Sequence, residues 1–151
     1  MKVARITLSD RAVAGVYADA SGPEIERVIS GQFVGPLEWT RVLLGDDRAA
    51  LETELRRLAD DLRCPLILTT GGTGPAPRDV TPEATRAVIE KELPGFGELM
   101  RLQNFTRVRT SILSRATAGV RGRSLIVNLP GRPAAIEQSL PLLTPAIAEA
   151  L

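Results

Sequence analysis

Histidine is absent from the 151 residues of this chain, and cysteine occurs only once. Without histidine the chain cannot form a Ser-His-Asp or Cys-His nucleophile, and it has no imidazole ligands for zinc. Catalysis must therefore use carboxylates, Lys or Arg, hydroxyls, backbone amides or a hard cation. The single cysteine, Cys64, excludes an intrachain disulfide, and its place at the start of an apolar run predicts a small buried side chain.

Aromatic residues and net charge are also scarce. The chain has three Phe, one Trp and one Tyr, and its 19 basic and 18 acidic residues give a formal net charge of +1. This composition offers neither the stacking platforms nor the basic surface expected of a nucleic-acid or membrane partner. We expect Tyr17, Trp39 and the phenylalanines to serve in packing. No apolar run approaches transmembrane length and no signal-peptide pattern opens the chain, so a cytoplasmic protein is expected.

The chain does contain an alternation of short apolar runs with amphipathic stretches. It predicts strands over 3–8, 39–44, 65–69 and 124–129, a helix that starts at Ser21, helices over 51–62, 81–93 and 94–106, and a closing helix marked by apolar residues between Ile136 and Leu151. Ser21 and Glu24 have capping-box spacing. This alternation predicts one α/β domain over residues 1–151, with three layers: a mainly parallel sheet and helices on both of its faces.

Polar or glycine-bearing residues follow each predicted strand. Because ligands of open α/β sheets bind at the carboxyl ends of the strands, we expect these segments to meet at one edge. Structural alternatives remain: a plain turn after the first strand, a helix N-cap at Asp46 or Asp47, and a rigid stop after the last strand. The segments are Ser9-Asp10-Arg11, Gly45-Asp46-Asp47, the loop 70–74 and Asn128-Leu129-Pro130-Gly131.

The most informative segment is the loop Thr69-Thr70-Gly71-Gly72-Thr73-Gly74-Pro75, which joins a predicted strand to a predicted helix. Three glycines in four positions allow backbone N–H groups to approach an anion closely, so a phosphate site is favoured over a simple tight turn. The glycine spacing fits neither a Walker A loop nor a dinucleotide fingerprint. Thr81 is predicted to cap the next helix, with Pro82 at its first position.

Two carboxylates, Asp46 and Asp79, lie beside this loop in the predicted arrangement, and Arg78 adds a cation. Mg²⁺ commonly takes one or two carboxylates together with water and substrate phosphates, so the pair predicts a magnesium site. Asp79 could alternatively do no more than complement the dipole of the following helix. Ser114 and Arg115 are either rim groups or solvated surface.

Taken together, these segments resemble the molybdopterin adenylyltransferase family of molybdenum-cofactor synthesis, which includes the G domains of gephyrin and of its plant counterpart. The resemblance covers nearly the whole chain, and the joint match is specific although Gly-Gly-Thr-Gly alone would not be. The matching segments are Ser9-Asp10-Arg11-Ala12 with Gly15, Tyr17 and Asp19; 68–74; 77–85; Pro94-Gly95-Phe96-Gly97; Leu113-Ser114-Arg115; and Asn128-Leu129-Pro130-Gly131 with Pro133.

The resemblance implies a homotrimer that uses ATP and Mg²⁺ to adenylylate the terminal phosphate of molybdopterin and releases pyrophosphate. It also implies a hand-over of the product to a molybdate-insertion protein. Asp46 and Asp79 match the two aspartates that the family needs for the reaction and for the metal. The implied substrate- and nucleotide-binding residues are Ser9, Asp10, Arg11, Thr70, Gly71, Gly72, Thr73, Gly74, Arg78, Ser114, Arg115, Pro130 and Gly131.

Two residues depart from the family pattern. Val13 stands where relatives often have serine, and Arg132 interrupts the usual Pro-Gly-Asn-Pro or Pro-Gly-Ser-Pro. Two other functions stay open: a non-catalytic pterin-binding module of the same fold, and a nucleotide phosphohydrolase. The presence of both Asp46 and Asp79 argues against a pure binding module, and cleavage of ATP without molybdopterin would identify a hydrolase.

Overall fold

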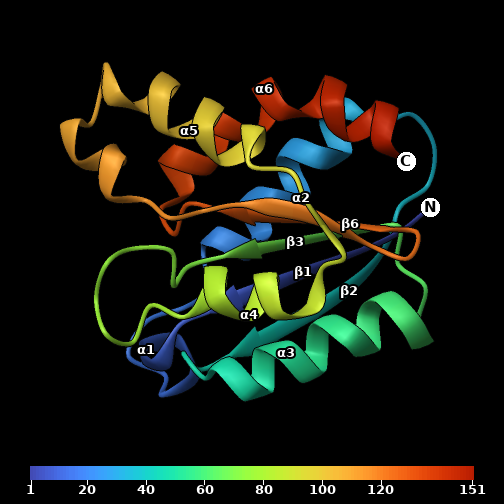
Figure 1. Ribbon diagram of the computed structural model, residues 1–151, viewed down its shortest axis with the longest axis horizontal. Helices are drawn as coiled ribbons and strands as arrows, with labels where there is room; N and C mark the ends of the chain where they lie inside the picture. Colours follow the sequence, from blue (N-terminus) through green and yellow to red (C-terminus); the bar gives the residue numbers. More distant parts are fainter.

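A six-stranded sheet forms the middle layer of the computed structural model, which describes all residues 1–151 (Figure 1). Four strands run parallel, and the last two in the spatial order are antiparallel to their neighbours. The predicted mainly parallel sheet is therefore confirmed. The spatial order is β2 (Glu38–Leu44), β1 (Lys2–Leu8), β3 (Leu66–Thr70), β6 (Ser124–Leu129), β5 (Ala118–Arg121) and β4 (Lys91–Glu92).

Helices cover both faces of the sheet, as the sequence predicts (Figure 1). One face carries α2 (Ser21–Gln32), α5 (Gly95–Phe105) and α6 (Pro133–Ala150); the other carries α3 (Arg48–Arg56) and α4 (Thr81–Val88). Three short elements complete the fold: α1 (Asp10–Val13), a π-helical turn η1 (Arg57–Asp61) and a 3-10 turn η2 (Arg109–Leu113).

Two hydrophobic cores lie on opposite faces of the sheet, because successive strand residues point to opposite sides. In β3, Leu66 and Leu68 pack with α2 and α6, whereas Ile67 packs with α3 and α4. Cys64 is fully buried in the second core, as predicted, and burial raises the pKa of its thiol. None of the helices combines the length and apolar character that crossing a membrane demands.

The parallel strands end in register, which brings their following loops together. Leu8 pairs with Leu44, Thr7 pairs with Thr70, and Thr70 pairs with Leu129. The segments after β2, β1, β3 and β6 therefore leave the sheet at the same edge. This confirms the convergence expected from the sequence.

The predicted helix 81–93 is wrong beyond Val88. Ile89 is extended, and the next residues form β4 on the edge of β5, where the Glu90 N–H donates to the Val120 carbonyl at 2.8 Å and the Leu93 N–H to the Ala118 carbonyl at 2.7 Å. Both strands are too short to be recognised from periodicity, because their stability comes from pairing with each other and with β6.

Two predicted helix caps are also wrong. Helix α2 has Ala20 as N-cap; Asp19 Oδ1 accepts from the Gly22 N–H at 2.9 Å, and Ser21 Oγ instead donates to the Gly131 carbonyl at 2.7 Å. Thr81 is the first residue of α4, and its hydroxyl donates to the Gly71 carbonyl. Both hydroxyls are used to join distant loops.

We expect Gly97→Ala to lower the free energy of unfolding by roughly 1–3 kcal/mol, as overpacking a close contact does. A Cβ at Gly97 would run into the Ala116 carbonyl, so α5 would have to move away from the segment before β5. Gly95→Ala is the matched control, because a Cβ there meets nothing within 4 Å. Equal urea-denaturation midpoints for the two variants would contradict this packing argument.

Candidate functional site

The glycine loop crosses the carboxyl edge of the sheet between β1 and β6. Gly71 and Gly72 have φ values of +91° and +64°, a region that side-chain-bearing residues rarely adopt. A Cβ at Gly71 would collide with the Leu8 carbonyl, and a Cβ at Gly72 would lie 2.5 Å from Thr81 Oγ1. The loop thus passes close to its neighbours because it carries no side chains at these two positions.

Two threonines, Thr70 and Thr81, tie the first part of this loop to its neighbours. Thr70 Oγ1 donates to the Pro130 carbonyl at 2.7 Å, and Thr81 Oγ1 donates to the Gly71 carbonyl at 2.9 Å. The Thr81 N–H also donates to the Gly72 carbonyl at 3.1 Å. The two Thr81 bonds satisfy carbonyls of the loop and tie it to α4, and the Thr70 bond ties it to the turn after β6.

Asp46 and Asp10 bind each other's backbone where β2 and β1 end. The Asp46 N–H donates to Asp10 Oδ1 at 2.9 Å, and the Asp10 N–H donates to Asp46 Oδ2 at 3.2 Å. Asp47 takes the capping role for α3, accepting from the Ala50 N–H at 2.8 Å. The choice between Asp46 and Asp47 is thereby decided, and Asp46 faces the glycine loop.

Burial raises the pKa of the Asp46 carboxyl, and the negative charges of Asp10 and Asp79 raise it further, against the lowering effects of the Asp10 N–H and Arg78. Asp10 shows the opposite shift, because the Arg78 guanidinium and the Asp46 N–H lower its pKa. Arg78 Nε donates to Asp10 Oδ2 at 2.6 Å from an exposed position. The site therefore carries more negative charge than Arg78 alone neutralises.

Asp79 follows the glycine loop, shortly before α4 begins. Its Oδ2 accepts from the Ala76 N–H at 3.0 Å, and a Cβ at Gly74 would lie 2.8 Å from this oxygen. A Cβ at Gly72 would lie 3.3 Å from Asp46 Oδ1, so both aspartates border the glycine loop. No group of three or more His, Cys, Asp or Glu side chains is arranged to hold a metal ion. Two carboxylates that can be joined by phosphate and water oxygens are nevertheless a ligand set that suits Mg²⁺.

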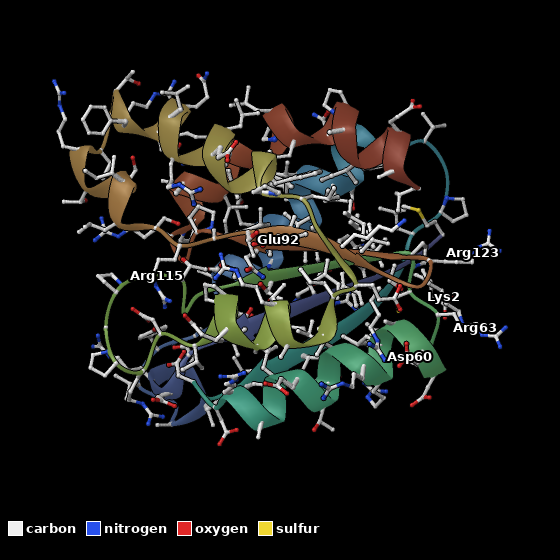
Figure 2. The ribbon with its side chains drawn as sticks, in the orientation of Figure 1. Lys2, Asp60, Arg63, Glu92, Arg115 and Arg123 are labelled. Atoms are coloured by element: carbon white, nitrogen blue, oxygen red, sulfur yellow. The ribbon has the colours of Figure 1, made fainter.

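The Arg115 side chain contacts the segment between the glycine loop and the first turn of α4 (Figure 2). Its Nε donates to the Gly74 carbonyl at 2.8 Å, its Nη2 donates to the Asp79 carbonyl at 2.7 Å, and its Nη1 pairs with Glu83. Its backbone N–H donates to the Thr73 carbonyl at 2.8 Å. The guanidinium thus holds the two ends of the segment 74–79, a structural role that the sequence did not predict.

Two cavities flank the loop. The α5 cavity, about 250 Å³, lies between α5, η2 and the start of α6; the β1 cavity, about 270 Å³, lies between the end of β1 and the start of α2. Residues of the α5 cavity include Thr73, Arg101, Asn104, Ser114, Pro130, Gly131 and Arg132; those of the β1 cavity include Ser9, Tyr17, Asp19, Thr70, Gly71, Gly131 and Arg132.

The expectation that Tyr17 serves in packing is wrong. Its side chain is 48% exposed, its hydroxyl lies 2.8 Å from Ser9 Oγ, and the Arg11 guanidinium lies 5.4 Å from the centre of its ring. Tyr17 thus forms part of the β1 cavity wall. A lone tyrosine in an irregular stretch has no periodicity that would identify it, and only its spacing from Ser9 and Asp19 in the family motif points to it.

Sequence reasoning also missed the α5 cavity as a site. Arg101 and Asn104 lie on one helical face, and they resemble ordinary polar surface until η2 and α6 close around them. Asn104 is buried and its Nδ2 donates to Ser139 Oγ of α6 at 2.8 Å. Ser114 reaches this cavity as the sequence allowed, whereas its neighbour Arg115 turns toward the loop.

Comparisons with known proteins find similarity over nearly the whole chain. Residues 4–149 match the family model of a "Probable molybdopterin binding domain". A molybdopterin adenylyltransferase of Helicobacter pylori strain J99 is 50% identical over 142 residues, which cover 94% of this chain and 81% of the relative. The Escherichia coli K12 molybdopterin adenylyltransferase is 45% identical over 140 residues, covering 93% and 72%.

A solved structure gives the same result for the fold. The molybdopterin biosynthesis enzyme MoaB of Thermus thermophilus superposes with a TM-score of 0.84 at 42% identity, covering 99% of this chain and 95% of that one.

We expect Arg115→Gln to lower the free energy of unfolding by about 2 kcal/mol, because it removes three charge-assisted contacts and leaves Glu83 without its partner. Arg123→Gln is the matched control, since this arginine is exposed, forms no ion pair and lies at the opposite end of the molecule (Figure 2). Denaturant unfolding followed by circular dichroism measures both. A loss for Arg115→Gln no larger than for Arg123→Gln would contradict the assigned role.

We expect Asp46→Asn to stabilise the metal-free protein at neutral pH. The folded-state pKa of Asp46 is raised above its ordinary value of 3.8, so its contribution to stability is present at low pH and is lost as pH rises through the folded-state pKa. Asparagine keeps an acceptor for the Asp10 N–H without the charge. Melting temperatures with a chelator present should favour the variant at pH 7 and converge below the ordinary pKa. A wild type that is more stable at pH 7 would refute this.

Proposed function

This chain belongs to the molybdopterin-binding domain family, and from this premise we propose that it is an adenylyltransferase of molybdenum-cofactor synthesis. It transfers AMP from ATP to the terminal phosphate of molybdopterin. The observation that carries the proposal is that Asp46 and Asp79 both border one glycine loop, with a cavity on either side of that loop. Two cavities suit a reaction that joins two substrates.

The reaction requires little proton transfer, which suits a chain without histidine. An oxygen of the molybdopterin phosphate attacks the α-phosphorus of ATP, the bond to the β-phosphate breaks, and pyrophosphate leaves with the electron pair. The attacking phosphate is already ionised near neutral pH. The main barrier is therefore the approach of two anions, which positioning and charge neutralisation lower.

Different residues of the site would position the phosphates, neutralise their charge and hold the metal. The glycine loop would offer backbone N–H groups to substrate phosphates, and Arg115 keeps segment 74–79 in place. Arg78 can exchange Asp10 for a substrate phosphate, because it is exposed and bound by a single ion pair. Asp46 and Asp79 would hold Mg²⁺ together with substrate oxygens. When bound, Mg²⁺ would neutralise phosphate charge and stabilise the departing pyrophosphate.

Three further features belong to the proposal. A homotrimer is supported by the family resemblance and by an apolar groove between α5 and α6, lined by Leu93, Phe96, Leu99 and Leu142 among others. Hand-over of the product to a molybdate-insertion protein follows from the same resemblance. A cytoplasmic location is supported by the single, buried cysteine, which cannot form an intrachain disulfide.

We expect Asp79→Asn and Asp46→Asn each to reduce single-turnover formation of adenylylated molybdopterin by about 100-fold or more, because each loses a metal-binding charge needed in the transition state. The dissociation constant for molybdopterin should change less than about threefold, a change worth under 1 kcal/mol. Asp47→Asn is the matched control: it lies beside Asp46, and asparagine is also a good N-cap. It should retain near wild-type turnover.

The same experiment discriminates the competing functions. Tight molybdopterin binding without product in the wild type would identify a non-catalytic binding module. Hydrolysis of ATP without molybdopterin would identify a nucleotide phosphohydrolase. Equal losses of binding and turnover in the Asp→Asn variants would refute the assigned roles of the two aspartates.

A further inference from the structure

The α5 cavity and the β1 cavity have two lining residues in common, Gly131 and Arg132. The glycine loop reaches both cavities as well, but through different residues: Thr73 in the first, and Thr70 and Gly71 in the second. Gly131 has no side chain, and a Cβ at this position would lie 3.4 Å from the Gly71 Cα. Arg132 is therefore the one side chain that lines both cavities, directly beside the glycine loop.

The backbone that carries Arg132 is held firmly. The Pro130 carbonyl accepts from Thr70 Oγ1 and the Gly131 carbonyl accepts from Ser21 Oγ, each at 2.7 Å. The Arg132 carbonyl accepts from the Ala135 N–H at 3.0 Å and from the Ile136 N–H at 3.1 Å as α6 begins. The guanidinium, in contrast, forms no ion pair or hydrogen bond and is exposed. A fixed backbone that carries an unpaired guanidinium suits ligand binding.

The charges around Arg132 favour an anion. No carboxylate lines the α5 cavity, whose other cation, Arg101, donates to the carbonyls of Ser114 and Ala116. Asp19 is the one carboxylate in the β1 cavity wall, and its two oxygens accept from Arg5, Thr7 and the Gly22 N–H. No acidic group of either wall is thus free to pair with Arg132.

We infer that Arg132 binds a phosphate group of a substrate at the junction of the two cavities. This inference rests on the proposed function, since that function supplies two phosphate-bearing substrates that must meet at the loop. A guanidinium pairs with phosphate oxygens through two parallel N–H bonds and keeps its charge at all relevant pH values. The asparagine or serine often found at this position in the family has no such charge and could not form this contact.

The test titrates the folded protein separately with Mg-ATP, with molybdopterin and with inorganic pyrophosphate, by calorimetry or fluorescence. Arg132→Gln should weaken binding of at least one ligand by about 10-fold, as loss of a charge-assisted hydrogen bond does. Arg132→Lys should recover part of it. Arg123→Gln, an exposed and unpaired arginine at the opposite end of the molecule, should bind like wild type. Melting temperatures verify that all variants fold.

The outcomes separate the source of the phosphate. Weakening confined to Mg-ATP and pyrophosphate assigns Arg132 to the nucleotide, and weakening confined to molybdopterin assigns it to the pterin phosphate. Unchanged affinities for all ligands, or a wild type that binds none of them, would overturn the inference. Adenylyl transfer by the wild type is measured in parallel. Its absence, with Arg132-dependent binding intact, would reject the proposed function and retain the phosphate contact.

Discussion

The close passage of the glycine loop across the end of β1 is the constraint on which the rest of this site depends. Gly71 lies where any side chain would collide with the Leu8 carbonyl, and Gly131 approaches it from the turn after β6. These contacts bring three strand ends to one place. The aspartates, both cavities and Arg132 are positioned relative to this crossing, because each lies on or beside one of the segments that meet there.

The site combines a backbone fixed by hydrogen bonds with an excess of negative charge. Thr81 and Arg115 donate to backbone carbonyls of the loop and of segment 74–79, and the Thr70 hydroxyl ties the loop to the turn after β6. On the ligand side, burial and neighbouring carboxylates raise the pKa of Asp46, and Arg78 is the nearest cation. Functional sites often keep such locally unfavourable electrostatics, which the scaffold offsets and a bound cation relieves.

Arginine has two distinct roles in this chain. The Arg115 guanidinium donates to two backbone carbonyls and pairs with Glu83, so its loss would disorder the loop. Arg132 and Arg78 instead have exposed guanidinium groups. That of Arg132 has no ion-pair partner, and that of Arg78 pairs only with Asp10. Sequence position does not separate these roles, since all three arginines lie outside the regular helices and strands. The separation comes from which carbonyls and carboxylates the fold brings within reach.

The sequence by itself determined the sheet class, the four parallel strands, the convergence of their ends and the placement of Asp46 and Asp79 beside the glycine loop, because periodicity and parallel topology place strand-end residues at one edge. The tertiary structure alone decided which of Asp46 and Asp47 caps α3, that Ser21 and Thr81 join loops and do not cap helices, and that Arg115 serves the loop. It also decided that Tyr17 and the α5 face line cavities. These outcomes depend on contacts between residues distant in sequence, and no local pattern encodes which partner a hydroxyl or guanidinium will meet.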